Sequence, residues 1–161
     1  MNTVYLIIGG NLGDRLLNLQ FAFARIYTGI GRITKASSAY RTEAWGNADQ
    51  PHFVNQVLLV ETGLAPQEIL QRIFQIEKSF NRERVHRNGP RTMDIDILFF
   101  NDFRLKEENL EIPHPRLHLR NFTLVPLAEI APDFIHPLLK KTIIQLLEES
   151  PDHLDVQKIS I

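Results

Sequence analysis

The order of two hydrophobic periods along the chain most constrains its fold. Runs rich in β-forming residues cover four stretches, 4–10, 32–40, 52–62 and 92–100. Apolar residues recur at every third or fourth position within 15–30 and 65–80, the spacing that gathers them on one face of a helix. The order strand-helix-strand, strand-helix-strand is that of the split βαβ of ferredoxin-like α+β domains. We therefore predict an antiparallel sheet with helices on one face.

Residues at the ends of the two helical stretches support these assignments. Asp14 stands where an N-cap residue is expected for a helix over 15–30, and Gly31 follows that helix as a stop. Pro66 stands in the first turn of the second helix, a position that tolerates proline. Both helices therefore have defined boundaries.

The rest of the chain predicts loops and an added helical part. Helical patterns return at 122–130 and 138–149, after an irregular, proline-containing segment at 109–122. They predict a C-terminal helical extension of the domain. Two polar stretches, 41–51 and 81–91, contain the residue types of surface loops, which often carry functional side chains.

The bulk properties indicate one domain and exclude several functions. The chain has 161 residues, which suits a single domain over 1–161, and its formal charge of -1 excludes a global field that would hold nucleic acid or an anionic membrane. The absence of cysteine excludes disulfides and thiolate metal sites. The start lacks the features of a signal peptide, and apolar runs are shorter than the roughly 18 residues of a membrane span. We expect a cytoplasmic protein.

The stretch "TMDIDILFF" places two carboxylates in a strand that otherwise reads as buried. Asp94 and Asp96 share one face because the side-chain period of a strand is two, and Met93, Ile95 and Ile97 share the other. Two carboxylates about 7 Å apart repel unless a cation or several donors compensate. Magnesium is the simplest compensating cation. The alternative is that both carboxylates face solvent or pair with nearby arginines.

A cluster of arginines precedes this strand. Arg82, Arg84, Arg87 and Arg91 lie in the glycine- and proline-containing loop 81–91. A solvated basic loop is the simpler interpretation. Guanidinium groups beside a carboxylate pair are, however, typical of sites that catalyse phosphoryl transfer. Catalysis there depends on positioning the substrates and neutralising their charge. The combination favours a nucleotide with magnesium.

The stretch "GGNLGD" after the first strand is a weaker signal. Its glycines do not fit the G-x-G-x-x-G spacing of dinucleotide-binding turns, counted from Gly9 or from Gly10. A tight turn with a helix cap is one interpretation. The other is that Asn11 offers its amide to a ligand.

Six stretches in a fixed order carry a resemblance to a known family. From residue 5 to about residue 132 they are "IIGGNLGDR", "SSAYRTEAWG", "QPHFVNQVLLVET", "IEKSFNRER", "GPRTMDIDIL" and "IPHPRLHLRNFTLVPLAEIAP". The chain resembles the 6-hydroxymethyl-7,8-dihydropterin pyrophosphokinases of folate biosynthesis. That family has a ferredoxin-like α+β fold, in agreement with the order of elements above.

The resemblance implies transfer of the pyrophosphoryl unit of ATP to the hydroxymethyl group of a reduced pterin, with AMP as product and two Mg²⁺ ions. It implies that Asp94 and Asp96 bind the metal ions and that Arg82 and Arg91 engage the phosphates during transfer. The ATP-binding positions that it implies are Glu77, Arg84, Ile97, His114 and Arg120. Without the resemblance, His114 would be read as an ordinary loop histidine.

The resemblance also implies a pterin site. Phe53 and Phe122 match the two rings that sandwich the pterin, and Asn55 presents both halves of an amide to its edge. Thr42, Glu43 and Trp45 match positions that contribute mainly main-chain hydrogen bonds. Aromatic residues in such a pattern would otherwise be read as core.

Departures from the family pattern fall mainly in loops. Position 74 is Phe where glutamine is common, and Asn88 stands where an aromatic residue is common in a loop that is one residue shorter here. Two rival functions are an RNA-binding ferredoxin-like module and a non-catalytic pterin or nucleotide sensor. The first would need paired aromatics where this strand carries acids, and the second would show loss of the aspartates or arginines. We expect a monomer that acts on ATP and a hydroxymethyldihydropterin.

Overall fold

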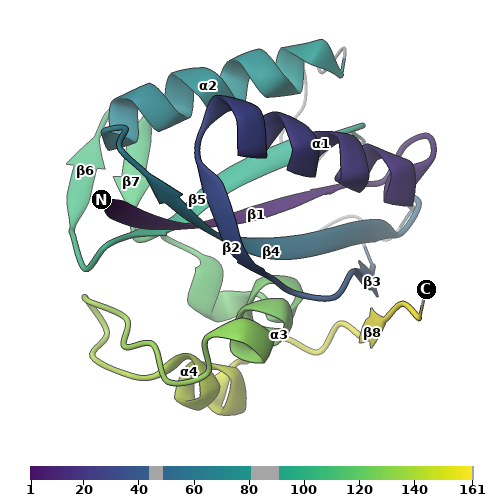
Figure 1. The fold of residues 1–161 in the computed structure, drawn as a ribbon. Helices are drawn as coiled ribbons and strands as arrows, with labels where there is room; N and C mark the ends of the chain where they lie inside the picture. Colours follow the sequence, from purple (N-terminus) through teal and green to yellow (C-terminus); the bar gives the residue numbers. More distant parts are fainter. Residues whose placement is uncertain (44–48, 81–90, 161) are drawn as a thin grey trace.

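The computed structural model describes residues 1–43, 49–80 and 91–160. Within these ranges a six-stranded antiparallel sheet forms the centre of the molecule (Figure 1). Its strand order is β5 (Asp94–Phe100), β1 (Asn2–Gly10), β4 (Phe53–Thr62), β3 (Tyr40–Thr42) and β8 (Val156–Lys158), with β2 (Arg32–Ala36) paired to the other end of β4. Among the described helices, none is long and apolar enough to cross a membrane.

Helices cover both faces of this sheet (Figure 1). The helices α1 (Arg15–Gly29) and α2 (Pro66–Ser79) lie on one face, and α3 (Asn121–Ile130) and α4 (Ile143–Glu149) lie against the other. The first pair with β1, β2, β4 and β5 is the predicted ferredoxin-like split βαβ, and the second pair is the predicted C-terminal extension. The predicted fold class is confirmed.

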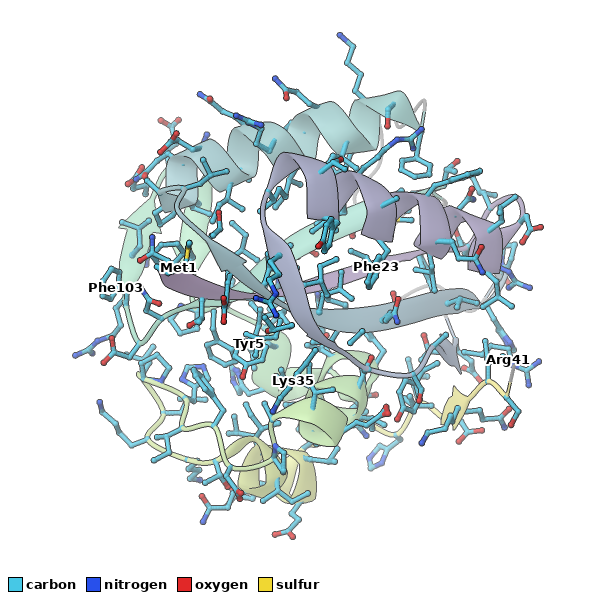
Figure 2. All side chains as sticks on the ribbon, in the orientation of Figure 1. Met1, Tyr5, Phe23, Lys35, Arg41 and Phe103 are labelled. Carbon is cyan, nitrogen blue, oxygen red and sulfur yellow. The ribbon has the colours of Figure 1, made fainter. Side chains whose placement is uncertain are left out.

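The alternation of side chains along β1 divides the interior into two cores. Leu6 and Ile8 point into the core beneath α1 and α2, while Tyr5 and Ile7 point into the core beneath α3 and α4. Figure 2 shows Tyr5 and Phe23 on opposite sides of the sheet. A central strand buried on both faces reads as a continuous apolar run, which explains why the sequence around residues 4–8 shows no alternation.

The two long helices begin and end close to their predicted limits. The side chain of Asp14 accepts a hydrogen bond from the amide of Leu17 at the start of α1, and α2 begins at Pro66. The predicted strand over 32–40 is instead two strands. Its break is stabilised by Ser37, whose hydroxyl accepts a hydrogen bond from the amide of Val57.

Other boundaries differ from prediction because of pairing between distant segments. Residues Arg41 and Thr42 belong to β3 and not to a loop, since β3 pairs with both β4 and β8. The segment predicted to be irregular contains β7 (Leu110–Ile112), paired with β6 (Leu105–Glu107), and a short 3₁₀ helix, Leu117–Leu119. The helix α4 begins only at Ile143, because Thr142 caps it in a reciprocal pair with Gln145.

Candidate active site

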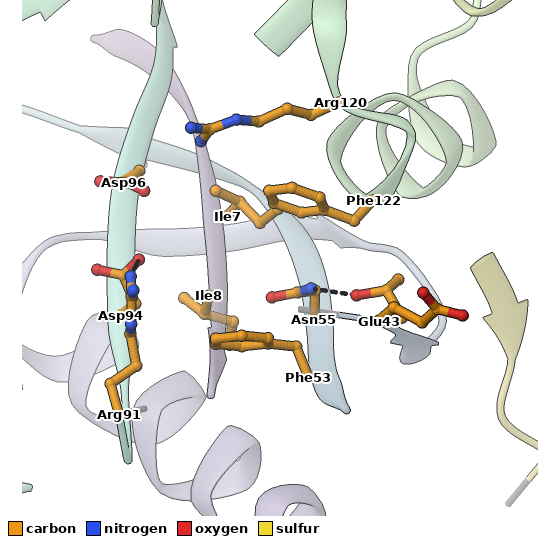
Figure 3. Close-up of a pocket in the computed structure, with 12 residues that line it drawn as sticks. Ile7, Ile8, Glu43, Phe53, Asn55, Arg91, Asp94, Asp96, Arg120 and Phe122 are labelled. Atoms are coloured by element: carbon orange, nitrogen blue, oxygen red, sulfur yellow. Dashed lines mark hydrogen bonds and ion pairs between the residues drawn. The ribbon is translucent and has the colours of Figure 1, made fainter. Parts of the chain in front are cut away.

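A pocket opens on the face of the sheet that α3 and α4 cover in part. Its empty volume is about 570 Å³, which includes open solvent at its mouth. Its lining comes from β1, β3, β4, β5 and the start of α3: Ile7, Ile8, Gly9, Thr42, Glu43, Phe53, Asn55, Arg91, Asp94, Asp96, Arg120 and Phe122 (Figure 3). Nine of the residues proposed from sequence therefore meet in one pocket, although they span 80 positions of the chain.

Strand β5 supplies the acidic side of the pocket. Asp94 and Asp96 lie opposite Gly9 and Ile7 of β1, and both line the pocket. The residues between and beside them, Met93, Ile95 and Ile97, are buried in the core under α1 and α2, as the two-residue period predicted.

Arg91 neutralises part of this acidic side. Its Nη1 lies 2.9 Å from Oδ2 of Asp94, and both side chains are largely buried. The alternative of an aspartate paired with a nearby arginine is thus realised at Asp94, but the pair faces the pocket and does not lie on an outer surface. The described lining of the pocket carries the carboxylates of Glu43, Asp94 and Asp96 and the guanidinium groups of Arg91 and Arg120.

Two aromatic rings form the opposite part of the pocket. Phe53, at the start of β4, and Phe122, at the start of α3, face the same space, with Asn55 at its end (Figure 3). The guanidinium carbon of Arg91 lies 5.5 Å from the ring centroid of Phe53, and that of Arg120 lies 5.6 Å from the ring centroid of Phe122. A flat ligand between these rings would have aromatic faces on two sides, an amide at its edge and cations nearby.

Gly9 is a pocket residue that the sequence argument did not identify. A Cβ atom added at Gly9 would lie 1.9 Å from Oδ1 of Asn55, its partner on the neighbouring strand. The side chain of Asn55 occupies the space above Gly9, and its Nδ2 donates to Oγ1 of Thr42 at 3.4 Å. The pair of glycines in "GGNLGD" was the available signal, because glycine in a strand marks a close approach of another group.

Asn11 does not offer its amide to the pocket as one interpretation proposed. It is 2% exposed, its Oδ1 accepts the amide hydrogen of Arg91, and its Nδ2 donates to Gln50 and to the carbonyl of Pro51. The side chain therefore binds other parts of the protein.

A second hollow of about 820 Å³ lies beside the first, over the outer side of β5. Its lining includes Phe74 of α2, Ile97, the segment 107–111 and His114. Asp96 lines both hollows, so they adjoin at this residue. The side chain of Ile97 is 5% exposed and packs into the core.

His114 is held in its neutral form. Burial, followed by the positive charge of Arg120, lowers the pKa of His114 to about 4. Its Nδ1 accepts the amide hydrogen of Arg116 at 3.1 Å, so the proton of the neutral ring lies on Nε2. His114 is therefore a hydrogen-bond donor at neutral pH without carrying a charge.

Glu77 supports β5 from the side of α2. It is 3% exposed, and its Oε2 accepts the amide hydrogen of Ile95 at 2.8 Å, which fixes the strand between the two aspartates. The remaining proposed residues, Trp45, Arg82 and Arg84, lie outside the described residues.

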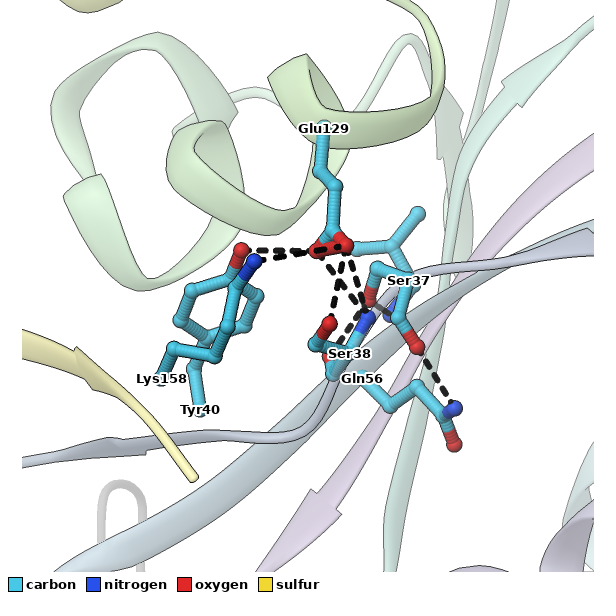
Figure 4. A network of polar contacts seen from close by, with 7 residues as sticks. Ser37, Ser38, Tyr40, Gln56, Glu129 and Lys158 are labelled. Atoms are coloured by element: carbon cyan, nitrogen blue, oxygen red, sulfur yellow. Dashed lines mark hydrogen bonds and ion pairs between the residues drawn. The ribbon is translucent and has the colours of Figure 1, made fainter. Parts of the chain in front are cut away.

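A polar network joins α3 to the strand that carries Thr42 (Figure 4). The carboxylate of Glu129 accepts hydrogen bonds from the Tyr40 hydroxyl at 2.6 Å and from the amide and hydroxyl of Ser38, and Nζ of Lys158 lies 4.0 Å away. Burial raises the pKa of Glu129, but the bonds from Tyr40 and Ser38 outweigh it and lower that pKa below its ordinary value. The network thereby connects α3, which carries Phe122, to β3, which carries Thr42.

Comparisons with known proteins agree with this geometry. Residues 5–132 match the family model described as 7,8-dihydro-6-hydroxymethylpterin-pyrophosphokinase. The 2-amino-4-hydroxy-6-hydroxymethyldihydropteridine pyrophosphokinase of Synechocystis sp. is 45% identical over 143 residues, which cover 88% of this chain and 73% of the relative. The enzyme of the same name from Aquifex aeolicus is 39% identical over 150 residues, which cover 93% of each chain.

Solved structures show the same fold. A crystal structure of Plasmodium falciparum HPPK-DHPS with pterin and p-hydroxybenzoate superposes with a TM-score of 0.76 at 20% sequence identity, over 92% of this chain. The chain spans 43% of the length of that structure, so the likeness concerns the fold of one part of it. From the family match, the close relatives and the pocket, we conclude that this chain belongs to the 7,8-dihydro-6-hydroxymethylpterin-pyrophosphokinase family.

Proposed function

We propose that the two adjoining hollows are the active site in which the chain transfers pyrophosphate from ATP to the hydroxymethyl group of 6-hydroxymethyl-7,8-dihydropterin. The products are AMP and the pterin diphosphate, an intermediate of folate biosynthesis. One observation carries this assignment of the site. The aromatic pocket and the hollow over β5 meet at Asp96, so that a pterin in one and a nucleotide in the other would present their reacting groups beside the same carboxylate.

The aromatic pocket suits the pterin. Phe53 and Phe122 would stack on the two faces of the ring, and Asn55 would donate to and accept from its amide edge. Thr42 and Glu43 line the same end, and Trp45 follows them in sequence. The fixed positions of Phe122 and Thr42 reduce the rotamer freedom lost when the ring binds.

The carboxylates of Asp94 and Asp96 fit magnesium. Oxygen ligands from one or two carboxylates, with water and substrate phosphates in the remaining positions, are the usual magnesium environment in enzymes that act on nucleotides. We assign two Mg²⁺ ions to this pair. When bound, they supply charge neutralisation of the triphosphate and align it with the attacking alcohol.

The cationic side chains suit the phosphates of ATP. Arg91 beside Asp94 and Arg120 at the start of α3 line the pocket, and His114 offers its Nε2 hydrogen from the adjoining hollow. Arg82 and Arg84 are assigned the same task from sequence. Glu77 is assigned a supporting place near the nucleotide through its bond to the amide of Ile95, and Ile97 a main-chain contact to adenine.

The chemistry needs little proton abstraction before transfer. A loose transition state for phosphoryl transfer develops little charge on the attacking oxygen, so positioning and neutralisation of charge dominate. The described pocket provides both through rigid elements, with Asp94 and Asp96 on a strand and Phe122 on a helix. A sensor that had lost catalysis would not need this acidic pair.

We propose that the protein acts as a monomer. ATP as co-substrate supports a cytoplasmic location. Light scattering of the purified protein tests the first of these proposals.

The test of the function is the identity of the nucleotide product. Purified protein with ATP, Mg²⁺ and 6-hydroxymethyl-7,8-dihydropterin should release AMP, detected by chromatography. Release of ADP, or no turnover, would contradict the proposal. Release of AMP without the pterin would indicate hydrolysis and contradict it equally.

A further inference from the structure

Asn11 joins two segments that flank the proposed active site. It follows β1, it is 2% exposed, and each functional group of its side chain has a partner in the protein. These partners are Arg91 on one side and Gln50 with Pro51 on the other, which are 40 or more positions apart in sequence. One side chain thus fixes the distance between two parts of the site.

The bonds to Arg91 act on its main chain. Oδ1 of Asn11 accepts the amide hydrogen of Arg91 at 2.9 Å, and the amide of Asn11 donates to the carbonyl of Arg91 at 2.9 Å. Both polar groups of the Arg91 main chain are therefore bonded to one residue. The guanidinium that contacts Asp94 and the ring of Phe53 projects from this fixed point.

The bonds to the other segment act just before Phe53. Nδ2 of Asn11 donates to Oε1 of Gln50 and to the carbonyl of Pro51, each at 3.1 Å. Pro51 precedes Phe53 by two residues, so the position of this carbonyl influences where β4 begins. The same carboxamide is therefore bonded to the residue that carries the guanidinium and to the segment that precedes the aromatic ring.

We propose that Asn11 is a positioning residue for pyrophosphoryl transfer, which sets the guanidinium of Arg91 relative to Phe53 through its bonds to Arg91, Gln50 and Pro51. The proposal rests on the proposed function of the pocket. It assigns Asn11 no contact with substrate. Its effect is on alignment, to which transfer reactions are sensitive, since a displacement of about 1 Å can reduce a rate on the order of a hundredfold.

The variant Asn11→Ala tests this assignment, with Asn18→Ala as its matched control. Asn18 also binds the turn after β1, through a bond from its Nδ2 to the carbonyl of Leu12 at 3.2 Å, so its partner is Leu12 and not Arg91. Both variants remove one asparagine side chain near the end of β1, that of Asn11 from the turn itself and that of Asn18 from the first part of α1. AMP release with ATP, Mg²⁺ and the pterin gives kcat and the KM of each substrate, and NMR hydrogen exchange reports the Arg91 amide.

The expected result is a selective effect on turnover. Asn11→Ala should lower kcat by about 10- to 100-fold, reduce the affinity for ATP by a smaller factor, and speed exchange of the Arg91 amide. Asn18→Ala should change none of these. A kcat equal to that of the control, or an Arg91 amide that exchanges at the parent rate, would overturn the proposal. So would a loss of ATP affinity as large as the loss of kcat, which indicates general disruption.

A milder variant keeps the proposal testable if Asn11→Ala does not fold. Gln50→Ala removes one acceptor and leaves both bonds between Asn11 and Arg91, so it should raise the KM of the pterin and lower kcat less. Parent-like kinetics in a folded Gln50→Ala would overturn the proposal. Lack of AMP release by the parent protein would refute the proposed function. Exchange of the Arg91 amide tests the role of Asn11 separately, because it is measured without turnover.

Discussion

The carboxamide of Asn55 occupies the space that a side chain at Gly9 would need. These residues pair across β1 and β4, and a Cβ on Gly9 would come within 1.9 Å of Oδ1 of Asn55. The position of the proposed pterin-binding amide therefore depends on the absence of a side chain on the neighbouring strand.

The variant Gly9→Ala tests this dependence. The added methyl group would also come within 2.7 Å of the carbonyl oxygen of Val54, so it should displace the carboxamide of Asn55 together with the adjacent main chain. We expect the KM of the pterin to rise by about 10- to 100-fold, the loss expected when a buried hydrogen-bonding group is left unpaired. The affinity for ATP should stay near that of the parent. Steady-state kinetics with each substrate varied in turn provide the measurement.

Gly29→Ala is the control for this experiment. Gly29 lies at the end of α1, where an added Cβ meets nothing within 4 Å, so alanine should be neutral or slightly stabilising there. An unchanged pterin KM in Gly9→Ala would show that Asn55 does not recognise the pterin from its present position.

Neutralising Asp96 should separate catalysis from stability. Asp96→Asn removes a proposed metal ligand, so kcat should fall by at least about a hundredfold. Because Ile95 and Ile97 remain packed in the core, the free energy of unfolding should change by less than about 1 kcal/mol. Thermal unfolding and a Mg²⁺ titration of activity are the measurements. A matching loss of stability and activity would favour a structural role.

Asp94→Asn is the companion variant because it also weakens the ion pair with Arg91. We expect it to raise the Mg²⁺ concentration needed for half-maximal activity, as Asp96→Asn does. An effect of Asp94→Asn that Mg²⁺ does not alter would assign Asp94 to holding Arg91 alone.

Acid should destabilise the protein through two histidines whose pKa values are lowered in the folded state. Burial lowers the pKa of both His114 and His136 to about 4, the first with help from Arg120 and the second with help from His118. Since each pKa is lower in the folded state than the ordinary value of about 6.5, the unfolded chain binds more protons between these values. The contribution of the two histidines to the free energy of unfolding should therefore be fully present above about pH 6.5 and decrease as the pH falls toward 4.

Thermal unfolding measured from pH 7.5 to pH 4.5 checks this dependence. Nδ1 of His136 accepts hydrogen bonds from the amides of Leu138 and Leu139, and His136→Asn keeps a side-chain acceptor for them. This variant should make the unfolding temperature depend less on pH. An unfolding temperature that rises on acidification would contradict the assignment of neutral histidines.

The network around Glu129 should couple the stability of the protein to the proposed pterin pocket. Glu129→Ala leaves the Tyr40 hydroxyl and two Ser38 donors without their carboxylate, and we expect a loss of about 1–2 kcal/mol, modest because the site is partly exposed to water. The pterin KM should rise because Phe122 and Thr42 lie on the joined elements.

Tyr40→Phe and the double variant complete a cycle for this network. A coupling energy above about 0.5 kcal/mol is expected for residues in one network. Additive effects would show that the bond between Tyr40 and Glu129 contributes little. The lowered pKa of Glu129 adds to the acid sensitivity of the fold. The ionised carboxylate stabilises the folded state fully above its ordinary pKa, and this stabilisation is lost as the pH falls through the lowered value.

Features with short sequence periods could be predicted from the sequence. The two-residue period placed Asp94 and Asp96 on one face and Ile95 and Ile97 on the other, and the structure confirms that division. The order of strands and helices was sufficient for the fold class. The gathering of Phe53, Asn55 and Phe122 required the family resemblance, because nothing local distinguishes a pocket phenylalanine from a core one.

Features set by distant partners could not be predicted. Ser37 interrupts a β-type run because its hydroxyl bonds to Val57, twenty positions away. The partners of Asn11 lie at positions 50, 51 and 91, and no local pattern marks them. The same reason applies to β8, a short strand in a weakly patterned tail that is defined only by its pairing with β3.

That last pairing bears on how the protein matures during synthesis. β3 carries Thr42 beside the pocket, and its outer neighbour is β8, with Arg41 bonded to a residue 116 positions later. A chain emerging from the ribosome has all the described pocket residues once Phe122 has appeared, yet this edge of the sheet remains unpaired until Val156–Lys158 follows. Contacts between such distant segments form slowly. Pairing of this edge therefore requires Val156–Lys158, a segment that is synthesised after every described pocket residue.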